Sequence, residues 1–313
     1  MKTRIQTLIA GLLLALIAAT PRISVGQSPR AQGSGGGAAR PGMLVTTAWL
    51  AEHARDKDLV LLHVGRRAQY DSGHIAGARL VSLADISLPA GPGKLSLQMP
   101  AVPELTAWAE AQGIGDRTRV IIVPHDDTLQ SSTRVFLTLA YLGAMDRTSL
   151  LDGGFKTWKS EGRGVTTEPA VAAAPAKFTP KPRAELIATM EQVEAATLDR
   201  RVSIVDARLP RFFEGNGGGF PRAGHIPTAV NIPLNTVSES TGRFRAPTEL
   251  RQLFVTSGVS GDKPVITYCH IGQQATLLWF VATMLGYDAR MYDGSFQEWS
   301  GTERLPVVVP PKK

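Results

Sequence analysis

The chain has 313 residues, enough for two ordinary domains that each bury a core of their own. Its formal charge is +7, but five basic residues within 1–42 and two at the carboxyl end, in stretches without acidic residues, account for the excess. The 34 basic residues less these seven leave 27, against 27 acidic residues. The rest of the chain therefore has no net charge, which excludes a broad basic surface for binding nucleic acid. A local basic pocket is still compatible with this balance.

Residues 1–26 have the pattern of a secretory signal peptide. Lys2 and Arg4 precede an apolar run over 8–19, and small residues follow. The run is shorter than the roughly 20 residues of a membrane-spanning helix. We therefore expect cleavage, after Gly26 or within 18–20, and no stable membrane insertion once the signal is removed. An N-terminal anchor that is left uncleaved is the alternative.

Residues 27–42 are too poor in apolar groups to fold and predict a flexible tether. Together with the signal pattern, they predict an exported protein that is periplasmic or secreted. Cys269 is the only cysteine, so no intramolecular disulfide can form. In an oxidising compartment a lone thiol favours a reactive role. A small buried core residue is the alternative.

The rest of the chain contains the same order of elements twice. Each copy has an apolar strand, a Gly-His-Ile turn, a second apolar strand, an apolar helix closed by glycine, and an Asp-Gly turn. In the first copy these elements are expected at 59–64, 73–78, 120–123, 135–142 and 151–155. In the second copy they are expected at 202–207, 224–229, 265–268, 275–285 and 292–296.

Short apolar strands that alternate with helices indicate an α/β fold, here two tandem domains that each contain a parallel sheet with helices on both faces. Residues 166–183 are rich in Pro, Ala and Lys and predict an extended linker. The domains are therefore expected at 43–165 and 184–307.

Residues that both copies share are expected to be structural. The first copy keeps the turn histidine without any nucleophile, so a hydrogen-bonding role is predicted for both histidines. By the same reasoning we expect core tryptophans and aspartates that form turns or helix caps. These pairs are His74 and His225, Trp158 and Trp299, and Asp152 and Asp293.

The chemistry is expected where the copies differ. The strand 265–268 is followed by Cys269, whereas the first copy has Pro124, which has no nucleophilic group. Cys269 is thus predicted at the carboxyl end of a parallel strand, just before a helix. Backbone N–H groups from the loop around Gly272 and the helix dipole favour a thiolate there, and equally an anionic persulfide. The first domain is predicted to be non-catalytic.

The ordered set of Asp-x-Arg after a strand, Gly-His-Ile, Cys after a strand, Asp-Gly and Trp resembles the rhodanese family. The likeness covers nearly all of 43–307 and is closest to the tandem-domain sulfurtransferases of the thiosulfate or 3-mercaptopyruvate type. It implies a ping-pong transfer of sulfane sulfur from a small anionic donor, through a Cys269 persulfide, to cyanide or a thiol. It implies no cofactor, and no metal site is expected, because the cluster at 124–127 lacks a ligand set.

The resemblance also implies which residues bind the donor. Arg208 and Arg211 resemble arginines that face it, and a guanidinium fork suits an oxyanion. The alternative for Arg208 is a salt bridge to Asp206, which is expected to order the loop. His270, Gly272, Gln273 and Gln274 complete the expected donor site.

The residues after Cys269 fit neither type of donor loop in the family. The thiosulfate type has two basic residues there and the mercaptopyruvate type has small polar ones. His270 would be cationic near an anionic donor, but His125 at the same place in the first copy allows a structural role. Thiosulfate is favoured as the donor because of the nearby arginines. A sulfur carrier with little turnover of free donors is the alternative function.

Overall fold

The structure is a computed structural model that describes residues 39–89, 91–173 and 176–309. The predicted signal segment 1–26 and residues 27–38 of the predicted tether lie outside the described residues. Within the described ranges, no helix combines the length and the apolar character that crossing a membrane requires.

Runs of buried aliphatic residues form two five-stranded sheets in which every neighbouring pair of strands is parallel. The first has the order β1-β5-β4-β2-β3, made of β1 (Leu44–Val45), β2 (Leu59–Val64), β3 (Arg79–Val81), β4 (Arg119–Pro124) and β5 (Thr148–Leu151). The second has the order β6-β10-β9-β7-β8, made of β6 (Ile187–Ala188), β7 (Ser203–Asp206), β8 (Val230–Asn231), β9 (Val265–Tyr268) and β10 (Ala289–Tyr292). The two sheets repeat one topology, which confirms the predicted tandem α/β fold.

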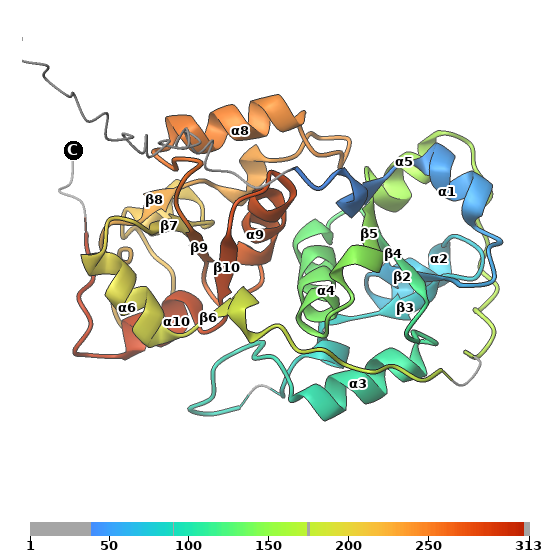
Figure 1. The fold of residues 1–313 in the computed structure, drawn as a ribbon, viewed down its shortest axis with the longest axis horizontal. Helices are drawn as coiled ribbons and strands as arrows, with labels where there is room; N and C mark the ends of the chain where they lie inside the picture. The colour runs from blue at the N-terminus through green and yellow to red at the C-terminus, as the bar shows by residue number, and fades with distance from the viewer. Residues whose placement is uncertain (1–38, 90, 174–175, 310–313) are drawn as a thin grey trace, which may run out of the picture. The chain divides into compact units, whose positions relative to one another are not determined.

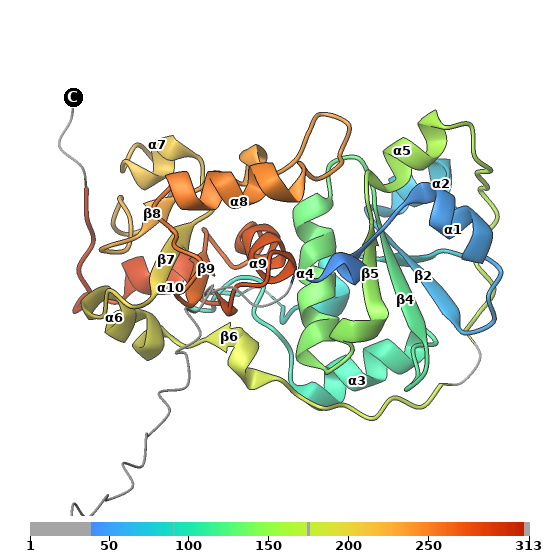
Figure 2. The same ribbon diagram turned by 45° about the horizontal axis from the view of Figure 1, so that its top comes forward.

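Helices cover both faces of each sheet (Figures 1 and 2). The first domain has α1 (Thr47–His53), α2 (Arg67–Ser72), α3 (Val102–Ala111), α4 (Leu129–Tyr141) and α5 (Gly154–Ser160). The second has α6 (Met190–Leu198), α7 (Pro210–Phe213), α8 (Pro247–Thr256), α9 (Ala275–Met284) and α10 (Ser295–Gly301). The predicted helix 275–285 is present, whereas α4 begins six residues before the predicted start at Val135.

Alternate residues of the central strands enter different cores, as the period of two requires. In β4, Val120 and Ile122 pack toward α4, while Ile121 packs toward α1 and α5. The core on the α4 side continues into the second domain without a break, because α4 and α9 lie side by side in both ribbon views. Phe136 meets Phe280 edge to face there, with ring centroids 4.9 Å apart.

The two histidines and the two tryptophans that were predicted to be structural have that role. His74 bonds the carbonyls of Tyr70 and Glu168 through its two ring nitrogens, at 2.9 and 3.0 Å. The ring of His225 bonds the Phe213 carbonyl at 2.8 Å. Both tryptophans of the repeat are buried in the cores.

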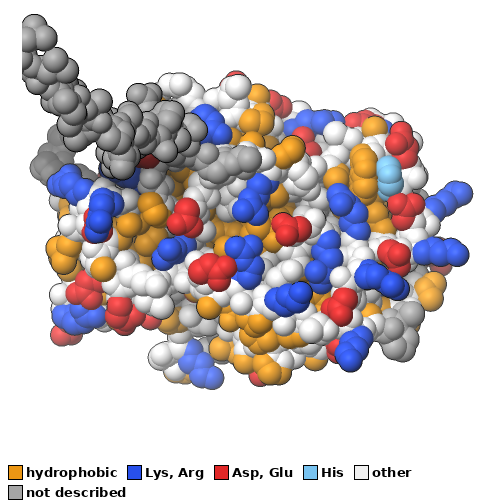
Figure 3. Space-filling model, viewed as in Figure 1, with side chains coloured by type: hydrophobic (Ala, Val, Ile, Leu, Met, Phe, Trp, Pro, Cys, Tyr) orange, Lys and Arg blue, Asp and Glu red, His pale blue; other side chains and the backbone are white. Residues whose placement is uncertain are grey.

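Charges of both signs are interspersed on the molecular face drawn in Figure 3, where Lys and Arg alternate with Asp and Glu.

Candidate active site

Cys269 directly follows β9, at the carboxyl edge of the second sheet, as predicted. Its N–H donates to the Ser295 hydroxyl at 3.2 Å, and this hydroxyl donates in turn to the Tyr292 carbonyl at 2.9 Å. The Cys269 side chain is fully buried, with 0% of its surface exposed. That burial alone would suit a small core residue, so the case for chemistry depends on the loop that follows.

The loop after Cys269 has most of its carbonyl groups tied by donors outside the loop or at its end. Five carbonyls are bonded: Cys269 O by Phe296 N at 3.0 Å, His270 O by Gln297 N at 3.0 Å, Gly272 O by Arg134 Nη1 at 3.1 Å, Gln273 O by Thr276 N at 3.2 Å, and Gln274 O by Leu277 N at 3.1 Å. Each bond fixes the orientation of a peptide plane.

The backbone N–H groups of the same loop have no such partners. From His270 to Ala275, none of them donates a hydrogen bond to an acceptor within the described part of the chain. In a planar trans peptide the C=O and the following N–H point in opposite directions. Because hydrogen-bond donors hold the carbonyls, the N–H group of each following residue points away from those donors. A run of unpaired amides beside a thiol is an arrangement that receives an anion.

Gly272 permits this path of the backbone. Its φ of +79° lies in the left-handed region, and a Cβ there would come within 2.6 Å of the Asp293 carbonyl oxygen. Only glycine avoids both the conformational and the steric penalty. Gly272 is one of the residues predicted from the sequence for the donor site, and the path of the loop requires a glycine there.

The corresponding loop of the first domain is partly closed by its own hydrogen bonds. The His125 N–H donates to the Val64 carbonyl and the Thr128 N–H to the His125 carbonyl, both at 3.1 Å. Burial and the nearby His125 and His74 lower the pKa of His63 to about 3, so the adjoining imidazole is neutral. With Pro124 in place of the cysteine, this loop offers neither a thiol nor a full run of free amides.

Arg208 lies in a buried ion pair with Asp206. Its Nε and Nη2 contact the Asp206 carboxylate, at 3.0 and 2.6 Å, and Nη2 also donates to the Gly224 carbonyl at 2.7 Å. The guanidinium stacks over Phe296, 4.1 Å from the ring centroid. The salt bridge that the sequence allows as the alternative role of Arg208 is therefore present, and Asp206 orders this loop by accepting from the Arg208 N–H at 2.9 Å. Contact of Arg208 with a donor stays a prediction.

Arg211 is exposed on α7 and has no carboxylate partner within the described ranges. Its guanidinium lies 4.5 Å from the centroid of the Phe212 ring. Of Arg208 and Arg211, it is therefore Arg211 whose guanidinium is available to bind an oxyanion.

His270 is neutral at neutral pH, which favours the structural role over the cationic one that the sequence also allowed. Burial lowers its pKa to about 4, with Arg208 and Arg211 acting in the same direction. Phe212 and Phe220 flank the imidazole, with ring centroids 4.6 and 5.5 Å away. At neutral pH this ring gives the site an apolar wall with a polar edge and no charge.

The two glutamines differ in their surroundings. The side-chain amide of Gln273 donates to Ser131 Oγ of the first domain at 2.9 Å. The Oε1 atom of Gln274 is buried and accepts no hydrogen bond within the described residues. The first is therefore an interdomain contact, and the second is an unpaired acceptor next to the loop.

Three polar residues at this site were not expected from the sequence. Ser295 anchors the Cys269 amide, while Ser131 and Arg134 reach the loop from α4. For the two α4 residues, the only signal in the sequence was an arginine preceded by three hydroxyl residues, ahead of an apolar stretch. Local patterns do not say which surface such residues meet.

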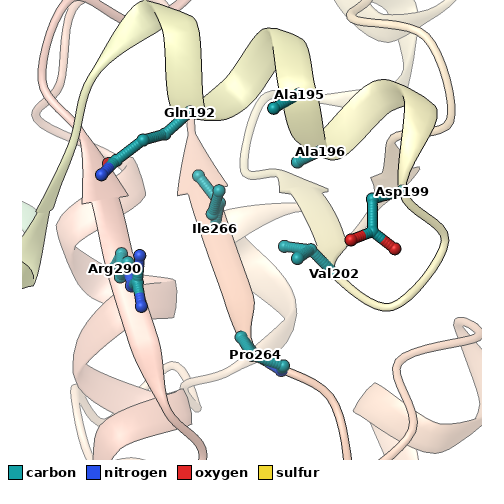
Figure 4. A pocket seen from close by; sticks show the side chains of 8 residues that line it. All are labelled: Gln192, Ala195, Ala196, Asp199, Val202, Pro264, Ile266 and Arg290. Atoms are coloured by element: carbon teal, nitrogen blue, oxygen red, sulfur yellow. The ribbon is translucent and has the colours of Figure 1, made fainter.

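A separate hollow of about 210 Å³ lies between α6 and the first residues of β9 and β10 (Figure 4). Ile266, Val202 and two α6 alanines give it an apolar lining, with Arg290 and Gln192 among the polar residues. At about 3.3 Å per residue, Ile266 lies roughly 10 Å along the strand from Cys269. The hollow thus belongs to the opposite end of the sheet.

Comparison with known proteins identifies the scaffold. The family described as "Rhodanese-like domain" matches residues 46–161 and again 185–302. The sequence is 31% identical to "Sulfur carrier protein TtuD" of Thermus thermophilus, covering 87% of this chain and 98% of that protein. It is 32% identical to a protein of Synechococcus elongatus named "Putative thiosulfate sulfurtransferase", covering 86% of each.

Solved structures share the fold at lower identity. The crystal structure of YnjE superposes with a TM-score of 0.77 at 23% identity, covering 86% of this chain and 69% of that one. The anaerobic ergothioneine biosynthesis enzyme of Chlorobium limicola superposes with a TM-score of 0.75 at 21% identity, covering 85% and 70%. Because the family matches both domains and the two sheets repeat one topology, the chain belongs to the rhodanese family and carries two copies of its domain.

Proposed function

We propose that this protein transfers sulfane sulfur from a small anionic donor to a thiophilic acceptor through a persulfide on Cys269. Sulfur transfer is supported at the level of the family by relatives at about 30% identity. The observation that carries the proposal is the run of unpaired amides from His270 to Ala275 directly after the only cysteine. Such a loop suits a thiolate before the transfer and an anionic outer sulfur after it.

With thiosulfate as the donor, the Cys269 thiolate attacks the outer sulfur. The S–S bond of thiosulfate breaks, and sulfite leaves with the bonding electron pair, so that three negative charges are present before and after the step. Cyanide or a thiolate then attacks the outer sulfur of the persulfide and regenerates the Cys269 thiolate. The step needs no oxidant and no separate general base.

Arg211 is proposed to hold the anionic end of the donor. It is exposed and without a carboxylate partner in the described ranges, and a planar guanidinium matches an oxyanion. Replacing it with alanine should raise KM for thiosulfate more than it changes kcat. An unchanged KM would assign Arg211 to packing on Phe212.

The burial of Cys269 imposes one requirement on this reaction. A thiol with 0% exposure meets a donor only when nearby side chains move. The segment around Phe212 and Phe220, which flank His270, carries consecutive glycines at 217–219, each with positive φ. We propose that this segment forms the rim through which the donor enters.

Mass spectrometry of the intact protein tests the proposal. Incubation with thiosulfate should add one sulfur, about 32 Da, at Cys269, and cyanide should remove it, while Cys269→Ser should take up none. If the wild-type protein stays unmodified with both thiosulfate and 3-mercaptopyruvate, the sulfurtransferase proposal is wrong.

A sulfur carrier is the second candidate, favoured by the similarity to a protein named as a sulfur carrier. A carrier would hold sulfur on Cys269 but release it slowly to cyanide. Steady-state turnover with thiosulfate and cyanide separates the two: many turnovers per protein support the enzyme, and a single loading without turnover supports the carrier.

We further propose that the protein is exported, on the strength of the signal pattern in residues 1–26. Fractionation of cells and sequencing of the mature N-terminus test this. A protein that retains Met1 in the cytoplasm would contradict it.

A further inference from the structure

The sulfur-binding loop of the second domain is held by an arginine of the first. Arg134 lies in α4 and its side chain has no exposed surface. Nη1 donates to the Gly272 carbonyl at 3.1 Å and forms an ion pair with Asp293, while Nη2 donates to the Leu97 carbonyl at 2.7 Å. A guanidinium is destabilising in the protein interior unless it is paired and hydrogen-bonded, and these contacts meet that requirement for Arg134.

We propose that Arg134 is a positioning residue for the Cys269 loop, and this rests on the proposed function. By holding the Gly272 carbonyl, Arg134 fixes the peptide plane between Gly272 and Gln273. The Gln273 N–H, which has no acceptor within the described residues, is then directed away from Arg134 and stays available to an anion. The first domain, which has Pro124 in place of a nucleophile, thus takes part in the reaction through this contact.

Asp293 completes the arrangement. One carboxylate oxygen pairs with Arg134, and the other accepts from the Met99 N–H of the first domain at 3.1 Å. The Gly272 backbone packs directly against Asp293, since a Cβ on Gly272 would meet its carbonyl oxygen. Arg134 and Asp293 therefore hold one peptide from two sides.

Holding the two domains together does not by itself explain the position of Arg134, because other contacts also join the domains. Arg243 of the second domain pairs with Glu161 of the first at 3.1 Å, and the Phe244 N–H donates to Asp152 at 3.0 Å. Neither contact touches the Cys269 loop. Arg243 is thus a matched control: an arginine in an interdomain ion pair, without a bond to the sulfur site.

The experiment compares Arg134→Gln, Arg134→Lys and Arg243→Gln in the whole protein. Each is loaded with sulfur from inorganic polysulfide and checked by mass, so that loading does not depend on thiosulfate turnover. Selective ¹⁵N labelling of glutamine, with the Gln273 signal assigned from its loss in Gln273→Glu, reports on the amide. Steady-state sulfur transfer is measured alongside, and thermal unfolding verifies the fold.

In the wild type, loading should shift the Gln273 amide proton downfield, as expected when it bonds the outer sulfur. Arg134→Gln should lose this shift and lower kcat by about tenfold or more with a smaller change in KM. Arg134→Lys should give a shift and a kcat between those of the wild type and of Arg134→Gln. A lysine has a single nitrogen, which cannot bond all three acceptors that the two guanidinium nitrogens of Arg134 reach. Arg243→Gln should retain the shift and keep kcat within about twofold.

A folded Arg134→Gln variant that keeps the shift and matches Arg243→Gln in kcat would overturn the inference. If that variant does not fold, Arg134→Lys decides, because wild-type kcat and a wild-type shift there would also overturn it. Failure of the wild type to take sulfur from thiosulfate is a different result: it counts against the proposed function, while the amide signal of the polysulfide-loaded protein still tests Arg134.

Discussion

Gly272→Ala should disrupt the Cys269 loop, and its cost can be worked out from two separate penalties. The φ of +79° places an L-residue in the left-handed region, which costs about 1–2 kcal/mol. The new Cβ would lie 2.6 Å from the Asp293 carbonyl oxygen, 0.8 Å short of the 3.4 Å at which ordinary contact begins. Relieving such an overlap costs about 1–3 kcal/mol more.

Gly77→Ala separates these two penalties. Gly77 has a φ of +78°, and a Cβ there would meet nothing within 4 Å. Alanine at position 77 should therefore lower the free energy of unfolding by about 1–2 kcal/mol, and alanine at position 272 by about 2–5 kcal/mol. Urea unfolding followed by circular dichroism gives both values, and sulfur loading of Cys269 should fall only in the Gly272 variant.

Equal losses of stability in the two variants would refute the steric part of this reasoning. Full sulfur loading of Gly272→Ala would refute the link between the path of the loop and the chemistry. A smaller loss of stability with abolished loading would show that the loop relaxes by moving its amides.

Two further predictions concern charge. Asp206→Asn should lower the free energy of unfolding in urea titration by about 3–5 kcal/mol, since it leaves the Arg208 guanidinium buried without its counter-ion. Asp199→Asn, in an exposed pair with Arg201, should leave the free energy of unfolding nearly unchanged. The pKa of His270, near 4 in the folded protein against 6.5 in the unfolded chain, means that unfolding takes up a proton between these values. Stability should therefore fall as pH drops from about 6.5 through 4, with a shallower fall in His270→Asn, and a fall as steep as in the wild type would assign the effect to other groups.

The parts of the fold that local patterns determine were predictable from the sequence. Apolar runs placed the central strands, and the repeated order of elements placed Cys269 at the carboxyl end of one of them. Glycine after an apolar stretch located the end of α9 to within a residue. These features depend on residues close together in the chain.

The start of α4 was mispredicted for a physical reason. Gln130, Ser131, Thr133 and Arg134 are polar, and polar residues ahead of an apolar run resemble a loop. They belong to the helix because they face the second domain, where Thr133 Oγ1 lies 2.8 Å from Thr276 Oγ1 and Arg134 meets Gly272. A surface made by a second domain cannot be seen in a local pattern.

The protonation state of His270, which the sequence left open, and the interdomain contacts of Asp293 could not be predicted for the same reason. The imidazole is neutral because Phe212 and Phe220, about 50 residues earlier in the chain, help to bury it. Asp293 was expected to form a turn or a helix cap, but its carboxylate also binds Arg134 and Met99 of the first domain. Both properties arise from contacts that form only on folding.

The enclosure of Cys269 has a kinetic consequence. A buried thiol reacts only from an opened conformation. While closing is faster than the reaction with the reagent, the observed rate rises in proportion to reagent concentration; once the reaction is faster than closing, the observed rate levels off at the rate of opening. Small thiol reagents of different intrinsic reactivity should then converge on one limiting rate. The same burial would keep water and oxidants away from a sulfur bound to Cys269 until the acceptor arrives.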